Sequence, residues 1–386
     1  MDIMPCRLAL FNETIAAFKA TGVLLLKLVD GGLFPLEYGY GGDPEIYPFV
    51  PVLVDWFHLS LDQAIWWTYA VFIGLGSAIA ITGFLRLCKD WVSRVVAVIG
   101  VLGVGAVCYV VYDIYLVSFF ALCFVPWLFV LLSEKNSIPL ALYCMLTGFV
   151  MVGVNFLRLH TATALGIVVV TAVVFYYKWS VRTLVLLFCF GCGAGLTSWG
   201  IQKALKVRNT YLDAHCIQHG STRVPHTFWH NIYAGLGFVT NDYGLWYGDD
   251  CSVAKVQEIA PDAVYLSDEY ENTLRDEIIK LCKTHPQFVL KTLFAKCGIL
   301  LYYLFIFANV GLLCAWFYRK PWYIEIPYWV ALWFSALPGV VTVPVAPYLT
   351  GFFTAATFYG IHSILWALQH GLYDKIVLRI RRLMSK

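Results

Sequence analysis

Charged residues are scarce in this sequence of 386 residues: only 13% are Asp, Glu, Lys or Arg, while 60% are hydrophobic. The mean hydropathy of +0.72 excludes an ordinary soluble globular domain. The 27 basic and 24 acidic residues nearly cancel, and neither sign forms a tract. We therefore exclude nucleic acid as a partner and expect a polytopic integral membrane protein that contacts membrane lipids.

Other recognisable features are also lacking. Arg7 is followed by no uninterrupted apolar run, so the start of the chain does not read as a cleavable signal peptide. Internal repeats, low-complexity tracts and coiled-coil heptads are absent from the sequence. Most of the 12 cysteines lie inside apolar runs, where cysteine behaves as a small hydrophobe, which argues against a disulfide scaffold. Whether Cys216 and Cys251 form a disulfide stays open.

Long apolar runs determine the expected fold class. A membrane-spanning helix needs about 20 apolar residues, and nine runs satisfy this: 64–86, 94–112, 114–132, 138–156, 161–178, 182–200, 293–318, 325–343 and 349–370. In the segment 8–29, Asn12, Lys19 and Lys27 would share one helical face opposite a leucine-rich face. It is either a tenth span or a helix in the membrane interface. The expected fold is an all-α polytopic membrane protein with about nine or ten transmembrane helices.

Basic residues predict the orientation. Lys and Arg gather in short connections of one parity, which the positive-inside rule makes cytoplasmic: 86–94, 134–135, 178–182, 319–320 and the tail 379–386. The alternate connections are then extracytoplasmic: 30–63, 112–115, 155–161, 201–291 and 343–348. These hold most of the chemically reactive residues, so we expect a multi-pass protein of the inner or plasma membrane whose active face is extracytoplasmic.

The segment 201–291 is the only long polar stretch, and it is too long for a structureless loop. We expect it to be an extracytoplasmic cap, mostly helical. It separates an N-terminal membrane bundle (1–200, with the first loop 30–63) from C-terminal membrane helices and a short basic tail (292–386).

A helix is predicted inside this cap, with Ser267 as its N-cap and Pro286 ending it. An apolar stripe of Tyr270, Leu274, Ile278 and Leu281 should pack on the membrane bundle. Glu271/Arg275 and Asp276/Lys280 are expected as i,i+4 ion pairs on the exposed face.

The first extracytoplasmic loop places two acids, Asp43 and Glu45, among glycines, prolines and the tyrosines Tyr40 and Tyr47. A carboxylate held at the membrane surface can take a proton from an acceptor hydroxyl. The alternative is a solvated turn whose aspartate only caps a helix.

This arrangement of spans and loops resembles the GT-C superfamily of polytopic glycosyltransferases, which use polyprenyl-phosphate-linked sugars as donors. The resemblance implies that Asp43 is the catalytic base, with Glu45 as a second acid and Asp113 helping to bind a metal or the acceptor. Whether the reaction needs a divalent cation as cofactor therefore stays open. The chain differs from the family in that its long loop lies between spans instead of forming a separate C-terminal domain. For Asp113 the alternative is an interfacial turn residue flanked by tyrosines.

A departing lipid phosphate needs fixed cations, and a guanidinium binds phosphate oxygens bidentately. The candidates are Arg158 and His160 at a helix end, and Arg223, His226 and His230 in the cap. Arg158 could instead extend toward lipid headgroups. His226 and His230 are four residues apart and could ligate a metal. They lack the Glu of a His-Glu-x-x-His motif, which favours structural histidines or phosphate donors.

The predicted function is an inverting transfer of a sugar from a polyprenyl-phosphate donor to a glycan or lipid acceptor. The residues expected to contact substrate are Tyr40, Tyr47, Trp229, Asp249 and Asp250. The base and the phosphate-binding cation must lie about one sugar ring apart, roughly 6–10 Å, so Asp43 should approach Arg158 or Arg223.

Two other classes stay open. A lipid or glycolipid transporter or flippase would need charged or broken helices near mid-bilayer, and the predicted spans carry almost no internal charge. A non-catalytic assembly subunit would use the aromatic stretch Phe228-Trp229 of the cap to bind a partner.

Overall fold

Apolar helices long enough to cross a membrane form most of the fold. The computed structural model describes residues 5–36, 47–134, 136–217 and 227–372. Within these ranges eight helical stretches satisfy that length: α3 (Leu61–Leu87), α4 (Trp91–Val111), Ile114–Leu132, α7 (Ser137–Leu157), α9 (Val181–Ala214), α13 (Pro286–Ala308), α15 (Trp322–Val341) and Pro347–Leu372. The predicted all-α polytopic membrane fold is confirmed.

The remaining predicted span, 161–178, is a shorter apolar helix, α8 (Thr163–Tyr177). The stretch Ile114–Leu132 contains α5 (Val117–Leu122) and α6 (Val125–Leu132), and Pro347–Leu372 contains α16 (Thr350–Ala367). Large apolar side chains point away from the bundle, including Phe188 and Phe294, which are 72% and 75% exposed. Such exposure is stable in lipid because the surrounding acyl chains are as apolar as the side chains.

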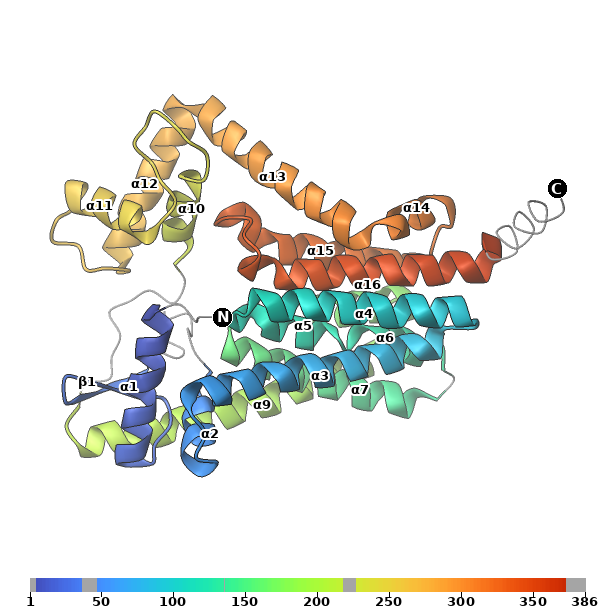
Figure 1. Ribbon diagram of the computed structural model, residues 1–386, viewed down its shortest axis with the longest axis horizontal. Coiled ribbons are helices and arrows are strands. Elements are labelled where there is room, and N and C mark those ends of the chain that lie inside the picture. The colour runs from blue at the N-terminus through green and yellow to red at the C-terminus, as the bar shows by residue number, and fades with distance from the viewer. Residues whose placement is uncertain (1–4, 37–46, 135, 218–226, 373–386) are drawn as a thin grey trace.

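The helices lie roughly side by side, and alternate connections meet at the same end of the bundle (Figure 1). We name the end where α4 and α7 terminate and α16 begins the cap end. The described connections that were predicted to share the extracytoplasmic side all lie there.

Polar caps mark several helix starts. Ser60 accepts the backbone N–H of Gln63, whose side chain accepts the backbone N–H of Ser60, so α3 begins with a complete capping box. Asp90 accepts the backbone N–H of Ser93 at 2.8 Å and caps α4. These local signals explain why the observed helices begin a few residues before the apolar runs.

Small residues bring α7 and α9 into close contact. A Cβ on Gly193 would overlap the carbonyl oxygen of Met145, and a Cβ on Gly148 would overlap that of Phe190. Backbones can approach so closely only where no side chain intervenes, which is how helices commonly pack in lipid.

The predicted span 293–318 is two helices and not one. α13 ends at Ala308, and α14 (Val310–Phe317) follows after Asn309, whose φ is 36°. The Asn309 side chain accepts the backbone N–H of Val310 at 2.6 Å and restarts the chain as a new helix. Asparagine adopts a positive φ more readily than most other non-glycine residues, so the break has a local cause that hydropathy does not register.

The segment 8–29 is likewise not one continuous helix. α1 (Pro5–Thr21) is followed by a hairpin of β1 (Leu26–Val29) and β2 (Gly32–Pro35), in which Val29 pairs with Gly32. Asp30 and Gly31 both have positive φ, as a two-residue hairpin turn requires. Lys27 therefore lies in a strand, and α1 is too short to be a tenth span.

The cap contains α10 (Phe228–Leu236), α11 (Asp249–Ile259) and α12 (Asp268–Thr284). Ser267 caps α12 by accepting the backbone N–H of Tyr270, as predicted. The stripe residues Leu274 and Ile278 are buried, but they pack with side chains of α10 and α11 in a core of the cap itself and not on the bundle. The cap therefore has its own hydrophobic core.

Two further expectations about the cap are wrong, and the disulfide that was left open is not formed. Arg275 pairs with Asp276 and Lys280 pairs with Glu277, so neither predicted i,i+4 pair forms. Glu271 is buried because it accepts hydrogen bonds from α10. Cys216 is exposed and Cys251 is buried, and both are free thiols.

The cap joins the bundle at the end of α15. Gly235 of α10 lies so close to the carbonyl oxygens of Val341 and Thr342 that a Cβ would overlap them. Lys296, buried in α13, donates to the carbonyl oxygens of Val340 at 3.0 Å and Val341 at 3.4 Å. A cation there satisfies carbonyls that the helix end leaves without partners. Three elements therefore meet at one junction.

Candidate functional site

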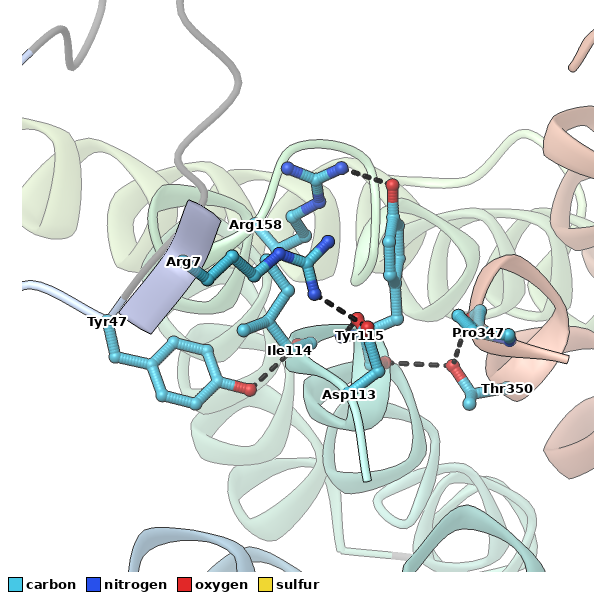
Figure 2. Close-up of polar contacts among 8 residues, drawn as sticks. All are labelled: Arg7, Tyr47, Asp113, Ile114, Tyr115, Arg158, Pro347 and Thr350. Atoms are coloured by element: carbon cyan, nitrogen blue, oxygen red, sulfur yellow. Dashed lines mark hydrogen bonds and ion pairs between the residues drawn. The ribbon is translucent and has the colours of Figure 1, made fainter. Parts of the chain in front are cut away.

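Asp113 lies at the cap end, in the turn between α4 and the 3-10 helix η1 (Ile114–Leu116). One carboxylate oxygen accepts the backbone N–H of Tyr115 at 3.3 Å, and the other forms an ion pair with Arg7 at 2.6 Å (Figure 2). The side chains of Arg7 and Asp113 are only 11% and 8% exposed. The carboxylate is therefore both buried and compensated, which fixes its orientation.

Arg7 was not among the residues predicted from the sequence. It reaches Asp113 from α1, across 106 positions of the chain. The available signal was one arginine near the start of the chain, which is also typical of a solvated surface. Only the packing of α1 against the cap end reveals the pair.

Arg158 follows α7 directly and is also buried, with 6% of its surface exposed. Its guanidinium lies 4.4 Å from the centroid of the Tyr115 ring and donates a hydrogen bond to the Tyr115 hydroxyl (Figure 2). Burial of this kind differs from a side chain extended toward lipid headgroups. The turn that carries Asp113 and Tyr115 thus receives an arginine from each of two distant elements.

Tyr115 also contacts the start of α16. Its carbonyl oxygen accepts the hydroxyl of Thr350 at 2.9 Å, and its ring meets that of Tyr348 edge-on at 5.0 Å. From the cap, Tyr247 lies beside Tyr348. Burial raises the pKa of Tyr247, and the Tyr348 hydroxyl raises it further. Tyrosines therefore connect the cap to this turn.

Tyr47, predicted to contact substrate, is buried and donates its hydroxyl hydrogen to the carbonyl oxygen of Ile114 at 2.7 Å. Its ring stacks on Phe49 and meets Tyr69 and Phe72 edge-on. Burial raises its pKa well above the ordinary value. These contacts attach the chain that follows the first loop to the residue next to Asp113.

A second polar group lies inside the cap around His230. Its Nδ1 lies 3.0 Å from the Tyr270 hydroxyl and its Nε2 lies 3.1 Å from Asp249 Oδ1. The hydrogen bond from His230 lowers the pKa of Asp249. Glu271 accepts the backbone N–H groups of Trp229 at 2.8 Å and His230 at 3.1 Å. Both ring nitrogens and the N-terminus of α10 already have protein partners, which favours a structural histidine.

Glu271→Ala is expected to loosen α10, because two buried backbone N–H groups would lose a charged acceptor. Hydrogen bonds to a charged group contribute about 1.5–3 kcal/mol each, so the cap should lose about 3–6 kcal/mol of local stability. Hydrogen–deuterium exchange of α10 would measure this as faster exchange. Glu269→Ala is the matched control, because Glu269 is exposed in the same helical turn. Equal exchange in the two variants would contradict the capping role.

The remaining predicted site residues are dispersed. His160 and Asp250 are exposed, and Trp229 is partly buried. Tyr40, Asp43, Glu45, Arg223 and His226 lie outside the described residues. Within the described part of the chain, no group of three His, Cys, Asp or Glu side chains could hold a metal ion. Of the predicted residues, the structure therefore brings Asp113, Arg158 and Tyr47 together at one turn.

Comparison of this chain with known proteins finds no match. No family model, curated protein or solved structure matches it. The fold defines an integral membrane protein with eight candidate spanning helices among its described residues. Its function must therefore be argued from the site.

Proposed function

We propose that this protein is a glycosyltransferase that moves a sugar from a polyprenyl-phosphate donor to a glycan or lipid acceptor, with inversion, at the extracytoplasmic membrane face. The observation that supports this most is the buried cluster at the cap end. Arg7 contacts Asp113 and Arg158 contacts Tyr115, so two distant parts of the chain each bring an arginine to this one turn. Ordinary helix packing does not need two buried arginines, and burying charged groups is costly unless they are compensated.

The charges in this cluster suit a phosphate. Arg7 is offset by Asp113, and Arg158 adds a second guanidinium beside the same turn. Guanidinium groups in a buried setting stabilise the charge that develops on a departing phosphate more strongly than they would in water. In this proposal Arg158 binds the donor phosphate and Asp113 orients Arg7. Arg223 and His226 stay further predicted phosphate contacts, whereas both ring nitrogens of His230 have protein partners.

The first loop returns to the same turn. Tyr47 is bound to Ile114, and Asp43 precedes Tyr47 by four positions. Covalent geometry then keeps the Cα atoms of Asp43 and Tyr47 within about 14 Å of each other. This limit is compatible with a base facing the arginine cluster across one sugar ring.

In the proposed reaction, Asp43 takes the proton from the acceptor hydroxyl. The acceptor oxygen forms a bond to the anomeric carbon while the bond from that carbon to the phosphate oxygen breaks. The bonding electrons leave on the lipid phosphate, whose charge Arg158 stabilises. Glu45 supports the base or a cation. Tyr40, Trp229, Asp249 and Asp250 are proposed to contact the sugar or the acceptor.

The buried cations elsewhere in the bundle already have protein partners, which does not favour the transporter alternative. Lys320 pairs with Glu325 at 3.0 Å and donates to Ser363 at 2.6 Å, and Lys296 donates to backbone carbonyls of α15. Groups held in this way join helices, whereas a transport pathway needs ionisable groups that can exchange partners.

Transfer assays test the proposal. Purified full-length protein would receive a panel of radiolabelled polyprenyl-phosphate sugars, with divalent cation or with chelator. Asp43→Asn should lower kcat by about 10²–10⁴-fold, since a general base contributes that much. Arg158→Gln should lower it by about 10²–10³-fold through loss of charge stabilisation.

Two variants serve as controls. Asp62→Asn and Arg86→Gln remove exposed charges of the same types and should leave transfer unchanged. Full activity of Asp43→Asn would refute the base. If wild-type protein transfers none of the sugars, the glycosyltransferase proposal fails and the assembly-subunit and transporter alternatives return.

A further inference from the structure

Tyr247 connects the cap to the turn that carries Tyr115. It lies in the segment 237–248 between α10 and α11, and its hydroxyl is hydrogen-bonded to that of Tyr348. The ring of Tyr348 lies 5.0 Å from the ring of Tyr115, whose hydroxyl accepts a hydrogen bond from Arg158. Tyr247 is nevertheless 42% exposed. One residue of the cap therefore lies beside the arginine site while much of its ring stays open.

The loop that carries this tyrosine is held by its own hydrogen bonds. Asn241 Oδ1 accepts the backbone N–H groups of Tyr243 at 3.0 Å and Leu245 at 3.2 Å, and its Nδ2 donates to the carbonyl oxygen of Leu245 at 2.9 Å. At the end of α10, a Cβ on Gly237 would overlap the backbone of Trp246, so glycine allows the loop to approach this closely. A loop fixed before binding loses less conformational freedom when a ligand binds.

The carboxylate of Asp249 lies near the Tyr247 hydroxyl. Burial raises the pKa of Tyr247, and the charge of Asp249 raises it further. One oxygen of Asp249 lies 3.1 Å from His230 Nε2, yet the side chain is 76% exposed. The hydrogen bond from His230 lowers the pKa of Asp249, so the carboxylate is ionised at neutral pH. Asp249 is thus oriented by a buried histidine and still open to a ligand.

An exposed aromatic ring near an oriented carboxylate suits a sugar. The face of the ring carries negative electrostatic potential and attracts the C–H groups on one side of a sugar ring. An ionised carboxylate only accepts hydrogen bonds, so it binds hydroxyl groups. A lipid headgroup fits less well, because Asp249 would repel its phosphate.

The position of this pair favours the acceptor over the donor. In the proposed reaction Arg158 binds the donor phosphate, and the donor lipid enters from the bilayer. The cap helices α10, α11 and α12 lie beyond the cap end of the bundle (Figure 1). A ligand that approaches the loop between α10 and α11 therefore comes from the water side, as a glycan chain would.

We propose that Tyr247 and Asp249 form a subsite for a sugar ring of the acceptor, which makes the acceptor a glycan and not a lipid. The tyrosine ring packs on one face of the sugar, and the carboxylate accepts a hydroxyl hydrogen. This inference rests on the proposed function, because it assigns the second substrate of the same site.

Saturation-transfer difference NMR tests the subsite without relying on catalysis. The probes are methyl glycosides of common hexoses and pentoses, added to the full-length protein in lipid nanodiscs, because maltoside detergents would themselves present a sugar. We expect saturation transfer to at least one glycoside. Tyr247→Ala and Asp249→Asn should each weaken its binding about tenfold, as loss of an aromatic contact or of a charged acceptor does. Tyr247→Phe keeps the ring and should bind as the wild type does.

Two matched controls lie in the same loop. Tyr243 is 44% exposed, and its ring lies 4.3 Å from that of His285 and 4.9 Å from that of Phe288. Asp242 is an exposed acid beside it. Tyr243→Ala and Asp242→Asn should leave glycoside binding unchanged.

Transfer kinetics give a second measurement. Tyr247→Ala should raise KM for the acceptor about tenfold, because the lost contact is made equally in the ground state and the transition state. KM for the donor and kcat should stay unchanged, since Arg158 is intact.

The outcomes separate the subsite from the proposed function. Absence of saturation transfer in the wild type, or equal binding by the wild type and Tyr247→Ala, would overturn the subsite. Equal losses in Tyr247→Phe and Tyr247→Ala would also overturn it, because the hydroxyl contact with Tyr348 would then be what matters. Glycoside binding that depends on Tyr247, in a protein that transfers no sugar, would support the subsite and overturn the glycosyltransferase. Transfer whose acceptor KM is the same in Tyr247→Ala would do the opposite.

Discussion

Asp113→Ala is expected to cost about 3–5 kcal/mol of stability, because it leaves the buried guanidinium of Arg7 without its carboxylate. The same substitution removes the acceptor for the backbone N–H of Tyr115, so the turn at the cap end loses its cap as well. Reversible unfolding by SDS titration in mixed micelles would measure the change in free energy.

A double-mutant cycle separates the ion pair from the cap. Arg7→Met alone should also destabilise, since it leaves a buried carboxylate, whereas Arg7→Met combined with Asp113→Ala should cost clearly less than the sum of the two. Asp90→Ala is the matched control, since Asp90 caps α4 with a carboxylate and should cost about 1 kcal/mol. Additive effects of Arg7→Met and Asp113→Ala would show that the pair is not coupled.

Gly193→Ala is expected to force α7 and α9 apart. The new methyl group would overlap the carbonyl oxygen of Met145, a backbone atom that no rotamer change can move. Overpacking costs about 1–3 kcal/mol and sometimes more, and this contact belongs at the upper end of that range. Gly148→Ala should behave alike, because its methyl group would meet the carbonyl oxygen of Phe190.

Neighbouring glycines on the same helix provide the control. A Cβ on Gly191 or Gly195 would meet no atom within 4 Å, so alanine there should leave stability unchanged or raise it slightly. The same SDS unfolding titration would rank all four variants. If Gly193→Ala is as stable as Gly191→Ala, the close crossing of α7 and α9 is not present in the membrane.

The spans were predictable because the signal is local. Crossing a hydrocarbon layer needs a continuous apolar run of fixed length, so composition alone locates most of the helices. The predictions failed where a short polar feature redirects the chain. Asn309 divides the run 293–318, and the Asp30-Gly31 turn gives the segment 8–29 a hairpin. Hydropathy averages over such residues, whereas backbone conformation depends on each of them.

The cap illustrates a different limit. Ser267 and the stripe of α12 were predictable because capping and helical periodicity are local properties. The surface on which that stripe packs was not predictable, because any apolar surface would bury the stripe equally well. Glu271 shows the same limit with charge. Its spacing matched an exposed i,i+4 pair, yet the N-terminus of α10 offers two backbone donors and holds it in the interior.

By itself, the sequence determined that this chain is a helical membrane protein and that Asp113 and Arg158 lie at the same end of the bundle. Alternating spans impose that parity, and parity needs only the count of crossings. Tertiary structure alone decided that Arg7 pairs with Asp113, that Arg158 lies over Tyr115, and that Arg208 holds Leu36. The physical reason is that parity confines residues to one end without specifying distance. These contacts join residues 43 to 172 positions apart, so they depend on how α1, η1 and the ends of α7 and α9 pack together.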